Sequence, residues 1–188
     1  MCQKTRRTGC VGLRRWRGGQ MEYRLGEYIV GCAVRRLAGD LGKAEGKPVV
    51  FNGTVGLVSV FGVRQRIEIP TRFLLKRDEK DIRCEEGHLN WQSLADLGAG
   101  RAKFRLSFES NALTCRGRSG DDIWFLIQPD GCSIVVLAEE GSSMNSQLRW
   151  LFDVKAAKGI GFSARRFGKG RSETSISERL VLEELGAA

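Results

Sequence analysis

The stretch IWFLIQPDGCSIVVLA, residues 123–138, decides the fold of this chain. It contains two runs rich in β-forming residues, 123–128 and 132–138, with Pro-Asp-Gly between them at 129–131. Proline fixes φ near the value that a turn needs, and glycine accepts the positive φ that closes the turn. The stretch therefore predicts a β-hairpin and a mainly β fold of the α+β type.

A further strand is predicted upstream, at RAKFRLSF, residues 101–108. Neighbouring side chains of a strand point to opposite faces, so one face of this strand is apolar and the other polar. The apolar set is Ala102, Phe104, Leu106 and Phe108, and the polar set is Arg101, Lys103, Arg105 and Ser107. A strand face with three cations is either exposed to solvent on the outside of the sheet or forms a binding surface for a polyanion.

Weaker patterns surround these two stretches. Residues 63–70 alternate as a strand that Pro70 ends, because proline has no N–H to donate, and 71–75 are expected to form a turn. Residues 88–92 form another short strand, and 49–61 a short turn-rich segment. Residues 21–37 fit either one helix or a strand followed by a turn.

Two helices are predicted near the carboxyl end. Ser142 is the candidate N-cap of the first, whose apolar residues recur at helical spacing from Met144 to Phe152. Ser175 and Glu178 form a capping box for the second, which continues to about residue 185. This second helix either docks on the main domain or belongs to something that follows it.

The charge of the chain is concentrated near its two ends. The 188 residues suit one medium domain with extensions, and their net charge is +9. Residues 1–20 hold six basic residues and no acid, and so do residues 155–171, whereas residues 21–154 hold 18 basic and 18 acidic residues. We therefore predict a basic leader at 1–20 (disordered, or an over-extended start before Met21), a folded body at 21–154, and a basic linker with a terminal helix at 155–188. Binding by the neutral body must come from local segregation of charge.

Several classes of protein lack support in the sequence. The six cysteines are scattered without a C-x-x-C pair and there is one histidine, so no zinc site is predicted, and the thiols are interpreted as reduced, in a cytoplasmic protein. Residues 1–20 lack the apolar core of a secretory signal, and no apolar run approaches the length of a membrane span.

One pattern raises the possibility of catalysis. Asp130 after Pro129, followed by Glu139 and Glu140, superficially matches a metal-dependent nuclease signature in which carboxylates hold Mg²⁺. The lysine of that signature is absent, and Pro-Asp-Gly is better explained as a turn. We predict no catalytic residue, metal ligand or cofactor in this chain; a compact nuclease using Asp130 and Glu139 is the alternative.

Binding chemistry is better represented than catalysis. Asn90, Trp91 and Gln92 join amides to an aromatic ring just before the loop that leads to the polar set of 101–108. Amides and guanidinium groups read base edges, and Lys and Arg hold phosphates. Burial of the indole is the competing interpretation of Trp91. A second, weaker cluster lies earlier in the chain and consists of Lys43, Lys47 and Asn52. The predicted DNA-binding residues are Lys43, Lys47, Asn52, Asn90, Trp91, Gln92, Arg101, Lys103 and Arg105.

The order of short segments between residues 22 and 154 resembles one known family. The segments are FNG (51–53), FG (61–62), GHLNW (87–91), FRLSF (104–108), GDDIW (120–124), DG (130–131), GS (141–142) and QLRWLF (147–152). They are similar to the amino-terminal DNA-binding domain of EcoRII-type restriction endonucleases, which is related to the pseudobarrel domain of plant transcription factors. The last segments, Gly-Ser followed by QLRWLF, are the most specific.

The resemblance implies an open seven-stranded β pseudobarrel with short flanking helices that grips the major groove of double-stranded DNA with two arms. By position, one arm is the loop 43–52, and the other spans 90–105, with Arg101, Lys103 and Arg105 facing DNA. In relatives of full length a nuclease domain follows, so Mg²⁺ is expected only for an attached nuclease domain or subunit. The expected function is the recognition part of a type II restriction endonuclease. A protein-interaction domain whose basic ends bind nucleic acid nonspecifically is a further alternative.

Overall fold

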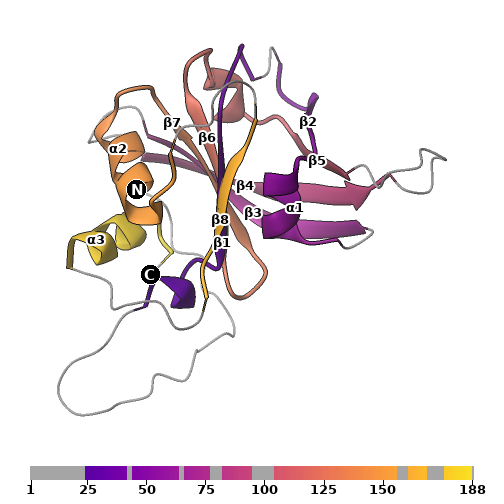
Figure 1. Cartoon of the computed structure of the whole chain (residues 1–188). Helices are drawn as coiled ribbons and strands as arrows, with labels where there is room; N and C mark the ends of the chain where they lie inside the picture. Colours follow the sequence, from indigo (N-terminus) through magenta and orange to yellow (C-terminus); the bar gives the residue numbers. More distant parts are fainter. Residues whose placement is uncertain are drawn as a thin grey trace.

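The computed structural model describes residues 24–41, 44–63, 66–76, 82–94, 104–155, 161–168 and 176–187. These residues form one curled mixed sheet of eight strands with three short helices (Figure 1). The elements in chain order are η1 (Leu25–Glu27), β1 (Gly31–Arg36), β2 (Pro48–Asn52), α1 (Val55–Phe61), β3 (Arg66–Lys76), β4 (Ile82–Ser93), β5 (Phe104–Glu109), η3 (Thr114–Arg116), β6 (Asp122–Ile127), β7 (Ser133–Ala138), α2 (Ser143–Phe152), β8 (Ser163–Arg166) and α3 (Ile176–Glu184).

The strands follow the order β2-β5-β4-β3-β7-β6-β1-β8, and β2 and β8 are the two edges. Every neighbouring pair is antiparallel except β3 and β7, which run parallel. The mainly β prediction is confirmed. The described residues contain eight strands where seven were expected, and one of the eight is β8, in a segment that we predicted to be a linker.

The hairpin predicted over residues 123–138 is confirmed as β6 and β7. Ile127 pairs with Ser133 at its closed end, and Gly131 has φ of 86°, which the turn requires. The N–H of Cys132 donates to the Asp130 carboxylate at 2.9 Å, so this carboxylate stabilises the turn. All six residues of β7 are buried, because the sheet is covered on both faces at this strand.

The inner face of the sheet holds one apolar core, closed by α1. Leu57, Val60 and Phe61 of this helix are buried there beside the inward side chains of the strands. The turn-rich prediction for 49–61 was wrong, since this segment forms most of β2 and then a helix. Thr54 begins the helix, because its hydroxyl accepts a hydrogen bond from the Leu57 N–H at 3.4 Å.

The outer face holds a second apolar core under α2 and α3. The Ser142 N-cap is confirmed: its hydroxyl accepts from the Asn145 N–H at 3.2 Å. The predicted stripe of α2 is confirmed as well, because Met144, Leu148, Leu151 and Phe152 are all buried in this core.

The terminal helix docks on the main domain. Val181, Leu182 and Leu185 pack in the outer core. Arg72 of β3 donates to the carbonyl oxygens of Leu185, at 2.7 Å, and Gly186, at 2.9 Å. Residues beyond the boundary predicted at 154 therefore contact the same sheet, because α3 packs on β3 and β8 pairs with β1.

Strand β3 continues through Pro70 to Lys76, which corrects both the predicted stop and the predicted turn at 71–75. Pro70 faces His88 of β4, whereas pairing with β7 begins one residue later, at Thr71. A proline is tolerated here because its missing N–H falls where the β7 side of the strand has no partner. Upstream, the ambiguous segment 21–37 contains η1 and then β1.

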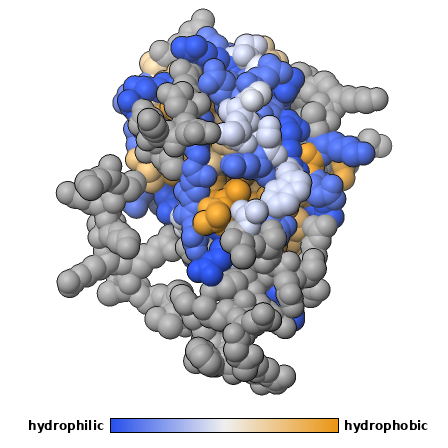
Figure 2. All heavy atoms as spheres, turned by 90° about the vertical axis from the view of Figure 1, so that its left-hand side faces the viewer, coloured by the Kyte–Doolittle hydropathy of each residue, from blue (hydrophilic) through white to orange (hydrophobic). Residues whose placement is uncertain are grey.

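The surface over α2 and α3 is mostly hydrophilic, with smaller hydrophobic areas between the polar residues (Figure 2). Trp150 of α2 and Leu180 of α3 are large apolar side chains that remain exposed. Within the described ranges, no helix is long and apolar enough to cross a membrane. The four cysteines of those ranges form no disulfide with one another.

Candidate nucleic-acid interface

Four polar side chains form a row across the outer face of β2, β5, β4 and β3. Asn52 pairs with Arg105, Arg105 with Gln92, and Gln92 with Arg66. Side chains in register on neighbouring strands lie on the same face and about 4.8 Å apart at the backbone, so the row extends roughly 14 Å. We call these four residues the polar row.

A second row lies two residues further along the strands. Val50, Ser107, Asn90 and Glu68 are in register there. The residues of both rows are half-buried or exposed. The helices lie elsewhere: α1 packs on the inner face, and α2 and α3 on the outer face beyond β3 (Figure 1). In the part of the chain that the structure describes, no helix covers this half of the outer face, which we call the polar sheet face.

Arg105 lies at the centre of the polar row. It is half-buried between Asn52 and Gln92, and its neighbours Phe104 and Leu106 are buried on the inner face, as the alternation predicted. The Nε atom of Arg105 is buried and has no hydrogen-bond partner among the described residues. A guanidinium in this position has donor capacity left for a ligand, because arginine carries five N–H donors.

Trp91 does not belong to the predicted interface, and the structure corrects this prediction. Its side chain is fully buried, and the indole N–H donates to the Gly62 carbonyl at 3.0 Å. Its ring stacks on Phe104 with centroids 5.1 Å apart, and on Phe61 at 5.2 Å. Trp91 therefore anchors β4 from the inner side, and its neighbours Asn90 and Gln92 point outward by alternation.

The structure separates the second predicted cluster. Lys47 precedes β2 and Asn52 ends it, so their backbones lie about 17 Å apart along the strand. Asn52 joins the polar row, whereas Lys47 is exposed at the opposite end of β2. Lys43, Arg101 and Lys103 lie outside the described residues. Arg66 was not among the predicted site residues, although the alternation of 63–70 placed it on the polar side of its strand.

Charge is segregated along the polar sheet face. The polar row carries Arg66 and Arg105 without an acid. Acids begin one row away with Glu68, which lies 3.9 Å from His88. Glu109 faces Pro48 at the far end of β2 and β5. The face is therefore cationic at one end only.

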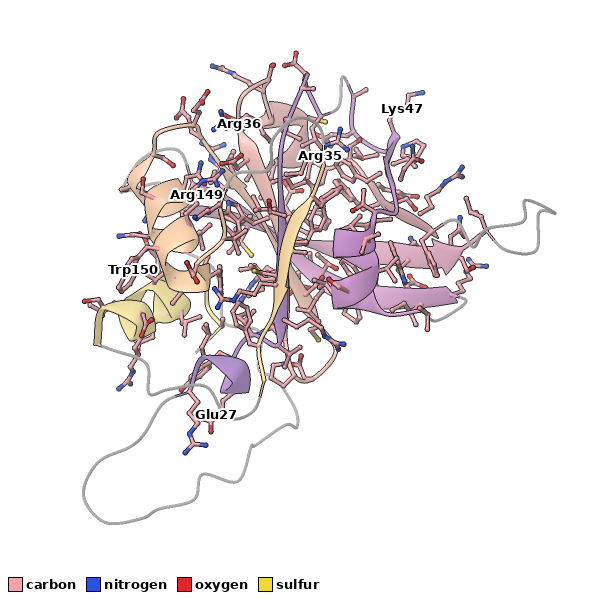
Figure 3. All side chains as sticks on the ribbon, in the orientation of Figure 1. Glu27, Arg35, Arg36, Lys47, Arg149 and Trp150 are labelled. Atoms are coloured by element: carbon pink, nitrogen blue, oxygen red, sulfur yellow. The ribbon has the colours of Figure 1, made fainter. Side chains whose placement is uncertain are left out.

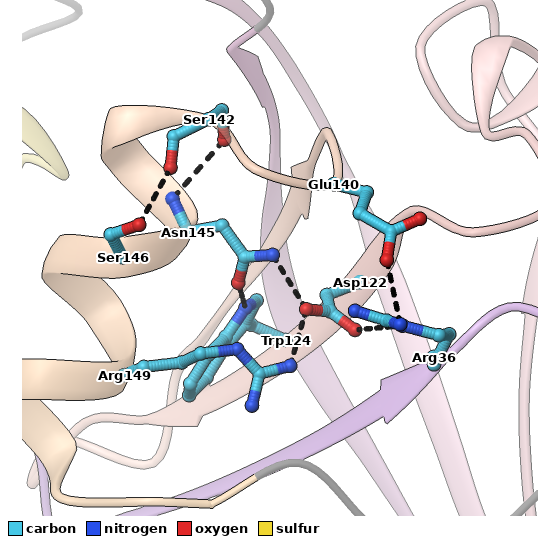
Figure 4. A network of polar contacts seen from close by, with 8 residues as sticks. All are labelled: Arg36, Asp122, Trp124, Glu140, Ser142, Asn145, Ser146 and Arg149. Carbon is cyan, nitrogen blue, oxygen red and sulfur yellow. Dashed lines mark hydrogen bonds and ion pairs between the residues drawn. The ribbon is translucent and has the colours of Figure 1, made fainter. Parts of the chain in front are cut away.

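A second polar cluster binds α2 to the sheet (Figure 4). Asp122 is fully buried at the start of β6, and its Oδ2 accepts from Asn145 Nδ2 at 2.6 Å and from Arg149 Nη2 at 2.5 Å. Its Oδ1 lies 3.6 Å from Arg36 Nε, and Asn145 Oδ1 accepts from the Trp124 indole at 3.3 Å. This closed arrangement of charges and amides joins the segments GDDIW and QLRWLF that carry the resemblance, so these segments have a structural role here.

The two carboxylates of the nuclease alternative, Asp130 and Glu139, lie far apart in the structure. Asp130 and Glu139 lie at opposite ends of β7, whose six residues extend about 20 Å. Two ligands of one Mg²⁺ each lie about 2.0–2.1 Å from the ion, so this pair does not share one. No group of three or more His, Cys, Asp or Glu side chains that could hold a metal ion occurs within the described ranges.

No protein-family model matches this chain, and no curated protein matches it either.

Proposed function

We propose that this chain binds double-stranded DNA through the polar sheet face, as the recognition part of a type II restriction endonuclease. The observation that carries the proposal is the polar row, which aligns two amides and two guanidinium groups on a face that no described helix covers. Amides pair bidentately with adenine, and arginine pairs bidentately with guanine. The resemblance of the segments between residues 22 and 154 supports the same function.

The edge position of β2 suggests how the sheet meets the duplex. The major groove of B-DNA is about 12 Å wide and admits a two-stranded β-ribbon, but not four strands side by side. The ribbon at the edge is β2 with β5, which carries Asn52 and Arg105. In this arrangement Asn52 and Arg105 contact base edges, while Gln92 and Arg66, on the next two strands, reach the phosphates at the rim of the groove.

Strand cleavage is then supplied by a nuclease domain or subunit, to which any Mg²⁺ belongs. Two features of the chain support this division. Asp130 is engaged in its own turn, and Glu139 lies a strand length away.

The proposal is tested by fluorescence anisotropy of the full chain with a random-sequence 20-bp duplex pool, followed by the duplexes that the chain enriches from it. Arg105→Ala is compared with Arg118→Ala, which removes the same charge from an exposed loop position outside the polar row. We expect Arg105→Ala to weaken binding of the enriched duplex by about 1–3 kcal/mol if it reads a base, or to reduce the salt slope by about one if it holds a phosphate.

Equal small losses for Arg105→Ala and Arg118→Ala, with no sequence enriched, contradict the proposal. That result favours the protein-interaction domain whose basic ends bind DNA nonspecifically, because counterion release alone does not distinguish one exposed cation from another.

A further inference from the structure

Arg35 is a cation on the inner face of β1, where the neighbouring inward side chains are apolar. It pairs across the sheet with Ile123, and Ala33 and Phe125 are buried beside it. Its guanidinium carbon lies 5.4 Å from the ring centroid of Phe51 and 5.6 Å from that of Phe162. The two rings are themselves in edge contact at 5.6 Å.

These two rings come from the two edges of the curled sheet. Phe51 belongs to the edge strand β2, and Phe162 directly precedes the edge strand β8. Arg35 therefore lies at the seam where the two edges approach each other. Contacts with two rings at a steep angle to one another hold the guanidinium in one orientation, which lowers the entropic cost of binding a ligand.

Arg36, the next residue, provides a matched comparison. It points to the other side of β1 (Figure 3), where it lies 3.6 Å from Asp122 and 2.7 Å from Glu140. Arg35 makes no hydrogen bond or ion pair through its side chain with any described residue, and its Nε is buried without a partner. A half-buried guanidinium in apolar surroundings without a counterion is unfavourable, and cation–π contacts offset only part of that cost.

We infer that Arg35 is the anchor of an oxyanion site at this seam, which takes a phosphate or carboxylate group. Such groups match the planar donor edge of a guanidinium, and partial burial strengthens the charge-assisted hydrogen bonds that they accept. The site is distinct from the polar row, because it lies on the inner face of the sheet. It does not depend on the proposed function.

The test follows the arginine Nε–H resonances of the ¹⁵N-labelled full chain during titration with sodium phosphate or sodium acetate, at ionic strength held constant with sodium chloride. The signal of Arg35 is assigned by its absence in Arg35→Gln. We expect this signal to shift and saturate, and Arg35→Gln to weaken anion binding about tenfold or more. Arg166→Gln is the matched control, because it removes an exposed cation of β8 and should leave the binding unchanged.

A short DNA duplex, used as a second probe, distinguishes the source of the phosphate. If the Arg35 signal shifts with duplex and free phosphate competes, the group belongs to the DNA backbone; if it shifts only with the small anions, the source is a free anion. The inference is overturned if the wild-type Arg35 signal moves with none of these probes. It is also overturned if Arg35→Gln binds phosphate as tightly as the wild type, which would leave Arg35 as a purely structural contact between two rings. Where Arg35→Gln folds poorly, the signal is assigned by its absence in Arg35→Lys, which keeps the charge, so the wild-type titration still gives a result.

Discussion

Removal of the buried carboxylate of Asp122 should destabilise the fold by about 3 kcal/mol. Breaking a buried ion pair by deleting one partner costs about 3–5 kcal/mol, because it leaves an uncompensated charge. The lower value is expected here because the Arg149 side chain is 24% exposed and the Arg36 side chain 45% exposed, so both cations can regain water. For a chain of this size, the loss corresponds to a decrease in Tm of roughly 6–12 °C.

The assay is urea unfolding of Asp122→Ala followed by tryptophan fluorescence, with Glu140→Ala as the matched control. Glu140 is an exposed partner of Arg36, so its removal should cost less than about 1 kcal/mol. Adding Arg149→Ala to Asp122→Ala should recover part of the loss, because the unpaired cation is then removed as well. A loss below about 1 kcal/mol for Asp122→Ala would refute the assignment of this cluster as the attachment of α2 to the sheet.

Three further outcomes follow from burial and packing. Trp91→Ala should lower the free energy of unfolding by about 3–5 kcal/mol in the same assay. Trp91→Phe should lower it less, because phenylalanine keeps the ring stack and only leaves the Gly62 carbonyl without its donor. A stability of Trp91→Ala close to that of the wild type would contradict the position of Trp91 in the core. Leu182→Ala should lower the free energy of unfolding by about 2–5 kcal/mol, because the side chain is buried. Leu180→Ala, at a side chain that is 59% exposed, should stay within about 0.5 kcal/mol of the wild type. Equal effects of the two substitutions would argue against docking of α3. Burial raises the pKa of Cys32 to about 12 from an ordinary 9.0, so the stabilisation from this neutral thiol is complete below pH 9 and is lost as the pH rises toward 12. Unfolding midpoints measured between pH 8 and 11 should therefore fall more steeply for the wild type than for Cys32→Ala. Parallel curves would show that ionisation of Cys32 does not cause the loss of stability.

The parts of the fold with strong local signals could be predicted from the sequence. The Pro-Asp-Gly turn specifies its own geometry, and both β6 and β7 are β-rich, so the hairpin was recognised. The alternation after Phe104 and the Ser142 cap are local in the same way. Each of these predictions depends on residues within a few positions of one another.

The errors arose where distant parts of the chain decide the outcome. From the local sequence, Pro70 was expected to end its strand. In the structure β3 continues, because pairing with β7 begins only at Thr71 and the missing N–H of Pro70 therefore breaks no pairing on that side. The sequence around β8 is basic and contains glycine, and only its pairing with β1 makes it a strand.

The candidate site was predicted in its residue types but not in its grouping. Alternation placed Arg105 and Arg66 on polar faces, yet the register that aligns them with Asn52 and Gln92 is a property of four strands together. Trp91 and Gln92 are adjacent in the sequence, and the pleat alone sends the first into the core and the second outward.

The most direct test of DNA binding by the polar sheet face is a map of the amide signals that shift when the full chain binds a duplex. Backbone and side-chain amide resonances are followed by NMR with the duplex that the chain enriches from a random pool. We predict that the largest shifts occur at Asn52, Gln92 and Arg105, with small shifts at Lys47, at the opposite end of the same edge strand. Shifts spread over exposed cations throughout the chain, with none concentrated on the polar row, would contradict the account.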